Sequence, residues 1–256
     1  MSPPQTLART LRELRWPIAA DRHEAVALMA EREGWSFGQY LHALADEEVE
    51  GKRQRRMDRL LKASGLPIDK SRSTLQLDRI PTKARRQITR AFEGDFVNAA
   101  ENLLLFGQPG RGKTHAACAI GHELVRAGYS VLFLPAYRLV QRLLSAKREL
   151  RLEKLIGQLD HQDVVIVDDL GYVQQDRTEM EVLFTFLAER YERRSVIITS
   201  NLVFSQWDRI FQDPMTTAAA IDRLVHHASI IEMVGDSVRA QAAETRRESE
   251  QAGPAP

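Results

Sequence analysis

The sequence contains only one cysteine, Cys118, which excludes intramolecular disulfide bonds and zinc centres that need several cysteines. It also lacks long hydrophobic runs: stretches such as Ala25–Ala30 are far shorter than the roughly 20 residues of a membrane-spanning helix. No apolar secretory core stands near the N-terminus. We therefore expect a cytoplasmic protein in a reducing compartment, with no signal peptide and no membrane partner.

The composition is ordinary, whereas the charge is unevenly distributed. With 43% hydrophobic and 28% charged residues, the chain suits one globular α/β domain plus a smaller one. Residues 21–50 hold eight acids against two arginines, a net charge of −6, and residues 51–90 hold thirteen Lys and Arg against three Asp, a net charge of +10. Such runs are commonly solvated helix faces, but a local charge of +10 also attracts nucleic-acid phosphates.

The first part of the chain has a helical pattern. Leucines recur at helical spacing near the N-terminus, and we expect Pro17 to end that helix. A second helix is expected over about 23–33, and a third begins after the cap residue Ser36 and ends at Gly65. Because no strand pattern occurs within 1–70, this region is predicted to be a small helical module that binds DNA or a partner.

The residue pattern changes after residue 70. Residues 71–98 form a basic connector with a predicted helix near 83–92. Beyond it, apolar runs of strand length alternate with helical patterns. The expected strands are 102–106, 130–134, 163–167, 195–199 and 229–233, and the expected helices are 113–127, 137–147, 179–193 and 216–226. This alternation predicts an α/β core over 99–239, a parallel sheet with helices on both faces, and the polar tail 240–256 is expected to be disordered.

A glycine-rich motif separates the first of these strands from its helix. It reads GQPGRGKT and has the complete G-x-x-x-x-G-K-T spacing of a P-loop, in which backbone N–H groups and a helix N-terminus bind phosphates. We expect Lys113 to contact the β- and γ-phosphates of ATP and the Thr114 hydroxyl to bind Mg²⁺. The alternative is a plain glycine-rich turn. The candidate nucleotide-binding residues are Gly107, Gln108, Pro109, Gly110, Arg111, Gly112, Lys113, Thr114 and His115.

Polar residues end two later strands. Asp168 and Asp169 follow VVIV, at the sheet edge where ligands of doubly wound sheets bind. Asp168 is the candidate second Mg²⁺ ligand, and Asp169 the candidate base for the attacking water. Asn201 follows the next strand and is a candidate to hold that water or to sense the γ-phosphate. The alternatives are an acidic turn that caps a helix and an asparagine that closes a turn.

The order of four strings carries a resemblance. GQPGRGKTH, VVIVDDLGY, VIITSNLVFSQW and AAAIDRLVHHASIIEMVGDSVR together resemble the IstB-like transposition helper ATPases, in the DnaC-like helicase-loader branch of the AAA+ proteins. The resemblance covers about residues 5–239. The P-loop string is generic, and the other three are much more specific.

The resemblance implies a P-loop AAA+ core behind a helical domain. It also implies an ATPase that assembles on DNA as a homo-oligomer and regulates the activity and target choice of a transposase encoded beside it. Arg223 matches the arginine finger that reaches a neighbouring subunit's ATP site, although from sequence alone it could pair with Asp222 or Asp236. Two features depart from the expected pattern. Many AAA+ proteins have Glu at the place of Asp169, although the Asp pair is usual for this branch. The string at 235–239 lacks the family's tyrosine, and Arg239 in it stays a candidate cis sensor.

Two basic clusters are candidates for contact with the backbone of double-stranded DNA. Their members are Lys52, Arg53, Arg55, Arg56, Arg59 and Lys62 in the first and Lys83, Arg85, Arg86 and Arg90 in the second. Rows of cations on helices suit phosphate contact without base recognition, so binding should depend steeply on salt. The alternative is that acidic and basic faces pair between neighbouring subunits.

The remaining candidates have simpler interpretations. Adjacent helical side chains point about 100° apart, so His226 and His227 are expected to be structural. Cys118 is expected to be buried, and Trp207 to serve packing. Three rival functions share the P-loop: a replicative helicase loader, a small-molecule kinase, and a nucleotide switch without hydrolysis.

Overall fold

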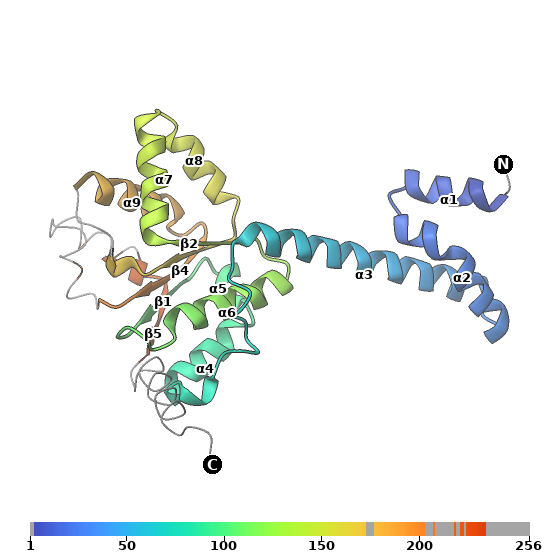
Figure 1. Ribbon diagram of the computed structural model, residues 1–256, viewed down its shortest axis with the longest axis horizontal. Helices are drawn as coiled ribbons and strands as arrows, with labels where there is room; N and C mark the ends of the chain where they lie inside the picture. Colours follow the sequence, from blue (N-terminus) through green and yellow to red (C-terminus); the bar gives the residue numbers. More distant parts are fainter. Residues whose placement is uncertain are drawn as a thin grey trace, which may run out of the picture. The chain divides into compact units, whose positions relative to one another are not determined.

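A computed structural model describes residues 3–172, 177–202, 207, 218, 221–222 and 224–233. The chain divides into two compact units, Met1–Arg59 and Leu60–Pro256. The first unit is helical and comprises α1 (Pro3–Glu13), α2 (Pro17–Glu33) and most of α3 (Phe37–Ser64), which continues into the second unit (Figure 1).

Short-range signals set the ends of these helices. Pro17 begins α2 instead of only ending α1, because proline fits the first turn, where its missing N–H is not needed. The predicted start near residue 23 was therefore too late. Gly34 ends α2 in the left-handed conformation with φ 66°. Ser36 and Gln39 cap α3 reciprocally: Gln39 N donates to Ser36 Oγ at 3.3 Å, and Ser36 N to Gln39 Oε1 at 2.8 Å.

A buried carboxylate joins α2 to α3. Glu48 Oε2 accepts hydrogen bonds from Ile18 N and Ala19 N, at 2.8 and 3.1 Å, and so caps α2 from the neighbouring helix. Gly51 allows the close approach, because a Cβ there would lie 1.8 Å from Ile18 Cδ1. The apolar core of this unit is small and is built around Ala19, Val26 and Leu44.

The second unit is built on one five-stranded parallel sheet. Its strands are β1 (Asn102–Phe106), β2 (Val131–Pro135), β3 (Val164–Asp168), β4 (Ser195–Ser200) and β5 (Ala228–Glu232). They are ordered β2-β3-β4-β1-β5, so β4 lies between β1 and β3. The register pairs Leu105 of β1 with Thr199 of β4.

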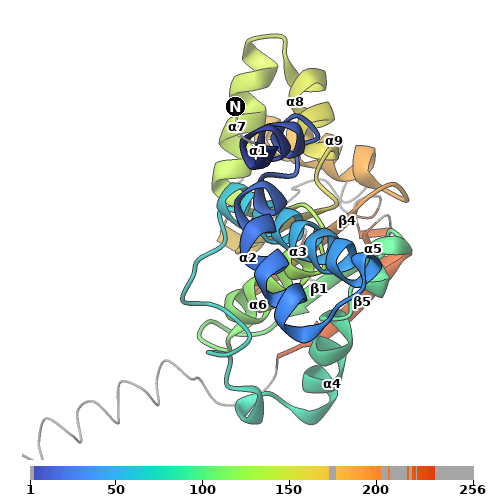
Figure 2. The same ribbon diagram turned by 90° about the vertical axis from the view of Figure 1, so that its right-hand side faces the viewer.

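Helices cover both faces of this sheet, as the runs of buried apolar residues predict (Figure 1). The helical elements are η1 (Leu77–Arg79), α4 (Thr82–Ala91), α5 (Asp95–Asn98), α6 (Lys113–Arg126), α7 (Ala136–Arg148), α8 (Leu152–Asp160), η2 (Leu170–Tyr172) and α9 (Arg177–Arg190). α4 and α6 pack on one face, and α7, α8 and α9 pack on the other, where α7 and α8 lie side by side in both views (Figure 2). On the latter face, Leu104, Val165 and Ile198 belong to one buried cluster with these helices.

The predicted parallel α/β architecture is confirmed, with strand ends shifted by at most a residue or so. α8 was not predicted, because its short segment follows α7 without a proline or glycine to mark the break. Of the expected helix over 216–226, residues 218, 221–222 and 224–225 are helical and 226 lies in a turn, while its other residues and the whole tail 240–256 fall outside the described residues. Among the described helices, none is long and apolar enough to cross a membrane.

Candidate nucleotide site

The loop between β1 and α6 has the backbone shape that the P-loop motif requires. Gly110 and Gly112 adopt left-handed φ values of 81° and 82°, which other residues reach only with strain. A Cβ at Gly107 would lie 2.4 Å from the carbonyl oxygen of Met233, just beyond β5. α6 then begins at Lys113, so its N-terminal N–H groups lie at the end of the loop.

Lys113 and Arg111 place positive charge in this loop. The Lys113 side chain is buried, and its Nζ donates to the carbonyls of Gly107, at 2.7 Å, and Gln108, at 3.0 Å. Arg111 Nη2 donates to Gln108 Oε1 at 3.1 Å, whereas its buried Nη1 has no partner within the described part of the chain. A buried donor without a partner is costly, so this atom is suited to an anionic ligand.

A threonine of β4 fixes the two aspartates that follow β3. Thr199 Oγ1 donates to Asp168 Oδ1 at 2.6 Å and accepts a hydrogen bond from Asp169 N at 2.9 Å. Asp168 is buried, while Asp169 is exposed and adopts a left-handed φ of 57°. One hydroxyl thus orients both acidic residues, a role that the sequence analysis missed although it noted the small polar residues at the end of this strand.

Asn201 lies at the end of β4, beside the turn that follows Asp169. Its Oδ1 is buried and has no hydrogen-bond partner within the described residues. Gly171 leaves the room for it, because a Cβ at position 171 would lie 2.0 Å from that oxygen. The amide therefore has an unused polar atom at the edge of the sheet.

Most of the loop, Asp169 and Asn201 line one cavity of about 520 Å³. Its walls comprise Lys70, Pro109, Gly110, Arg111, Gly112, Lys113, Thr114, His115, Asp169 and Asn201. The volume lies within the range of small-ligand sites. The Thr114 hydroxyl and the Asp168 carboxylate are hard oxygen donors of the kind that Mg²⁺ prefers, so the residues present fit a magnesium nucleotide.

Sequence reasoning also missed Lys70, which stands far upstream of the P-loop. The segment that carries it is fastened to α6 by two histidines. His115 Nε2 lies 3.0 Å from Thr74 Oγ1 and 3.2 Å from Ser71 O, and His122 Nε2 lies 3.0 Å from Pro67 O. His115, expected to have no chemical role, thus fastens this segment beside the loop. No sequence signal marks Lys70, because the contact depends on tertiary packing.

Other predicted site residues lie elsewhere. Arg223 and Arg239 fall outside the described residues. In the first basic cluster, Arg55 and Lys52 lie 3.2 and 3.9 Å from the buried Glu48 carboxylate. The cluster members with exposed side chains are Lys52, Arg53, Arg55, Arg56, Arg59 and Lys62 in α3 and Lys83, Arg86 and Arg90 in α4. Arg85 is half-buried and pairs with Asp78 at 3.5 Å.

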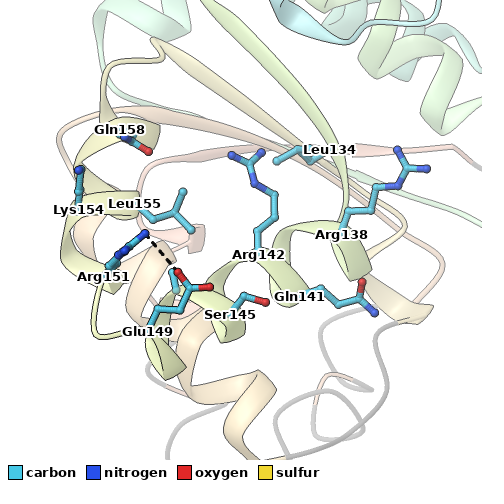
Figure 3. A pocket seen from close by; sticks show the side chains of 11 residues that line it. Leu134, Arg138, Gln141, Arg142, Ser145, Glu149, Arg151, Lys154, Leu155 and Gln158 are labelled. Carbon is cyan, nitrogen blue, oxygen red and sulfur yellow. Dashed lines mark ion pairs between the residues drawn. The ribbon is translucent and has the colours of Figure 1, made fainter.

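A second and larger cavity, of about 870 Å³, lies away from the P-loop (Figure 3). It is formed mainly by α7 and α8 and is rich in cations: Arg138, Arg142, Arg151 and Lys154. Figure 3 shows Arg142 extending from α7 between the two helices, and Arg151 paired with Glu149 at 3.5 Å. It holds none of the residues of the phosphate motif, so the smaller cavity is the candidate nucleotide site.

The structure also locates three residues with simpler expected roles. Cys118 is buried, and burial raises the pKa of its thiol to about 12. Trp207 is fully buried, and its Nε1 donates to Leu202 O at 3.1 Å. His226 and His227 lie in a turn after the helical residues 224–225, so the helical spacing assumed for them was wrong.

Comparison with known proteins identifies a family of ATP-binding proteins. A family model described as "IstB-like ATP binding protein" matches residues 9–246. An insertion sequence ATP-binding protein of Sinorhizobium fredii is 43% identical over 234 residues, which cover 91% of this chain and 78% of that protein. One of Pseudomonas aeruginosa is 36% identical over 216 residues, which cover 84% and 82%.

Solved structures share the fold at low sequence identity. DnaI superposes with a TM-score of 0.55 and 22% identity over 66% of this chain and 95% of that one. The replication initiator DnaA, bound to AMPPCP and single-stranded DNA, superposes with a TM-score of 0.57 and 16% identity over 73% and 56%. The sheet, the loop and the match along nearly the whole chain lead to one conclusion: the protein belongs to the IstB-like ATP-binding family of insertion sequences, with a P-loop AAA+ fold.

Proposed function

We propose that this protein is a DNA-binding ATPase that assists the transposase of an insertion sequence and hydrolyses ATP at the interfaces of a DNA-bound oligomer. The observation that carries the hydrolytic part is the single cavity that joins the P-loop to Asp169 and Asn201. A binding-only site would need no acid and no amide opposite the phosphate loop. The relatives, which are insertion sequence ATP-binding proteins, support the association with a transposase.

In this proposal the loop N–H groups and Lys113 bind the β- and γ-phosphates of ATP. Lys113 would exchange its two bonds to loop carbonyls for bonds to phosphate oxygens. Thr114 and Asp168 would hold Mg²⁺, which supplies charge neutralisation at the phosphates. Arg111, whose Nη1 is buried without a partner in the described chain, adds a further donor.

Asp169 and Asn201 act on the water. The Asp169 carboxylate takes a proton from water as the oxygen attacks the γ-phosphorus, and the bond to the β-phosphate oxygen breaks, giving ADP and phosphate. The unpartnered Asn201 Oδ1 accepts a hydrogen bond from the same water. Thr199 is a positioning residue, because its hydroxyl fixes Asp168 and the Asp169 backbone.

Arg223 completes the site from a neighbouring subunit. A guanidinium supplied in this way stabilises transition-state charge and raises phosphoryl-transfer rates by about 10³–10⁵. Arg223→Ala should therefore bind ATP and lose turnover, and Asp169→Asn should do the same. Mixing the two variants should restore part of the activity, because a mixed interface can combine an intact Asp169 with an intact Arg223. No recovery at any mixing ratio would contradict action between subunits.

DNA contact is proposed for the exposed cations of α3 and α4. The cationic cavity between α7 and α8 offers a further surface for phosphates, since Arg142 extends into it (Figure 3). Contacts of this kind give affinity without base specificity.

The test is ATP hydrolysis by the purified full chain, with and without double-stranded DNA, followed by capture of either transposase or replicative helicase. We expect DNA to stimulate hydrolysis and transposase to be retained. Stable capture of helicase alone would favour the helicase-loader alternative. Phosphoryl transfer to a metabolite, without DNA stimulation, would establish a kinase instead.

A further inference from the structure

Two adjacent histidines outside the nucleotide site meet a glutamate from another segment. His226 and His227 are exposed in the turn before β5, with ring centroids 4.3 Å apart. Glu192 lies just beyond the end of α9, with its Oε1 3.3 Å from His227 Nε2. One ligand atom of each of the three side chains lies within 4.8 Å of the others, in the only such cluster among the described residues.

The separation of Glu192 and His227 suits a metal ion. Two ligands bound at about 2.0–2.1 Å to a tetrahedral ion lie about 3.4 Å apart, close to the observed nitrogen–oxygen distance. The third side chain, His226, also has a ligand atom within 4.8 Å of the other two. Two imidazoles and one carboxylate are typical ligands of Zn²⁺ and similar transition metals.

A neighbouring tyrosine supports the arrangement. Tyr191 Oη lies 2.9 Å from His226 Nδ1, and this hydrogen bond fixes the ring and leaves Nε2 for a ligand. Ligating histidines usually bond their second ring nitrogen to such a partner. The donor set also differs from that of the proposed magnesium site, which offers oxygen only, so the two sites would select different metals.

We propose that Glu192, His226 and His227 form a surface site for one transition-metal ion such as Zn²⁺, with water completing its coordination. An ion there would link the end of α9 to the turn before β5. That turn follows directly on the segment that carries Arg223 in the sequence, so occupancy would restrain the chain beside that residue.

The test uses the full chain without a histidine tag, stripped with a chelator and kept in excess Mg²⁺ so that oxygen sites are occupied. Co²⁺ is titrated as a spectroscopic probe, since low-coordinate Co²⁺ absorbs visible light far more strongly than octahedral Co²⁺. We expect saturable binding of one equivalent, displacement by Zn²⁺, and a rise in the melting temperature with Zn²⁺.

Two variants and a matched control make the result specific. Glu192→Gln and His227→Ala should each weaken binding at least about tenfold, since a lost ligand costs no less than a lost supporting partner. Both side chains are exposed, so metal-free melting should be unchanged. His42→Ala is the control, because His42 Nε2 and Asp46 Oδ2 lie at a similar 3.2 Å, but no third ligand atom lies close to both among the described residues. Absence of saturable binding at millimolar Co²⁺, or equal binding by wild type and both variants, would overturn the proposal.

Discussion

The two units of this chain use charge and apolar surface in opposite ways. In the helical unit, Met1–Arg59, a buried carboxylate caps a helix, and large apolar side chains such as Phe37, Leu41 and Val49 are exposed. In the second unit, the three inner strands β1, β3 and β4 are buried along their whole length. Charged groups there collect at the carboxyl edge of the sheet, beside the phosphate loop. The comparison indicates that the second unit is stabilised mainly by its core, and the first by a small core plus specific polar contacts.

The largest expected effect concerns an exception to this rule, the buried Arg190 of the second unit. It donates to the carbonyls of Leu159, Gln162 and Ser195, and burial lowers its pKa to about 10. Arg190→Ala leaves these carbonyls without their donor and should lower the free energy of unfolding by about 3–5 kcal/mol. Urea denaturation measures the change. Arg193→Ala is the control, because this exposed arginine also pairs with Asp160 and should change stability by less than about 0.5 kcal/mol.

The second-largest expected effect tests nucleotide binding by the second unit. Lys113→Ala removes the loop cation and should weaken ATP binding at least about 100-fold, or about 3 kcal/mol. Calorimetry with the purified variant measures this affinity. Lys147→Ala, which removes a half-buried lysine that pairs with Glu181 away from the loop, should leave the affinity unchanged. Equal affinity of wild type and Lys113→Ala would refute the assignment of the P-loop.

The third effect tests whether the two units unfold separately. Leu44 belongs to the small core of the helical unit, so Leu44→Ala should destabilise that unit by about 2 kcal/mol and leave ATP affinity intact. Trp16 and Trp35 report on this unit, and a Trp207→Phe background removes the only other tryptophan signal. A parallel loss of ATP binding would show that the units are coupled.

The fourth expected effect compares two cationic surfaces, the exposed cations of α3 and the cavity between α7 and α8. Arg53→Gln with Arg59→Gln should reduce the salt dependence of DNA binding by about 1–2 in the slope of log K against log salt. Arg138→Gln with Arg142→Gln should do the same if the cavity between α7 and α8 also contacts phosphates. If a double variant leaves the slope unaltered, its surface does not contact DNA and is a solvated face.

The smallest expected effect concerns Cys118. Its thiol is buried, and its pKa lies above the ordinary value of 9, so an aromatic disulfide reagent should not label the native protein near neutral pH. In the range between 9 and 12 the native thiol keeps a proton that the unfolded thiol has lost, so stability should fall as pH rises through that range. Cys118→Ala should lose this part of the pH dependence. Rapid labelling of the native chain would contradict the burial.

The sequence predicted the sheet and the phosphate loop well because both depend on local signals. Apolar runs of five residues define buried strands, and three glycines before Lys113 define the loop. It missed Thr199 and Lys70 because their roles depend on which strand lies next to which and on how residues 67–74 pack against α6. It placed His226 and His227 on a helix, whereas the helical residues end at 225 and both histidines lie in the turn that follows.

The position of β4 sets the distance between the loop after β1 and the acidic residues after β3. Neighbouring strands are about 4.8 Å apart, so inserting one strand separates the phosphate loop after β1 from the acids after β3 by roughly 10 Å. If β1 and β3 were adjacent, an anionic phosphate bound after β1 would lie against a carboxylate after β3. In the proposed mechanism, a gap two strands wide holds the terminal phosphate with a water molecule behind it, and Asn201, which directly follows the intervening strand, borders that gap.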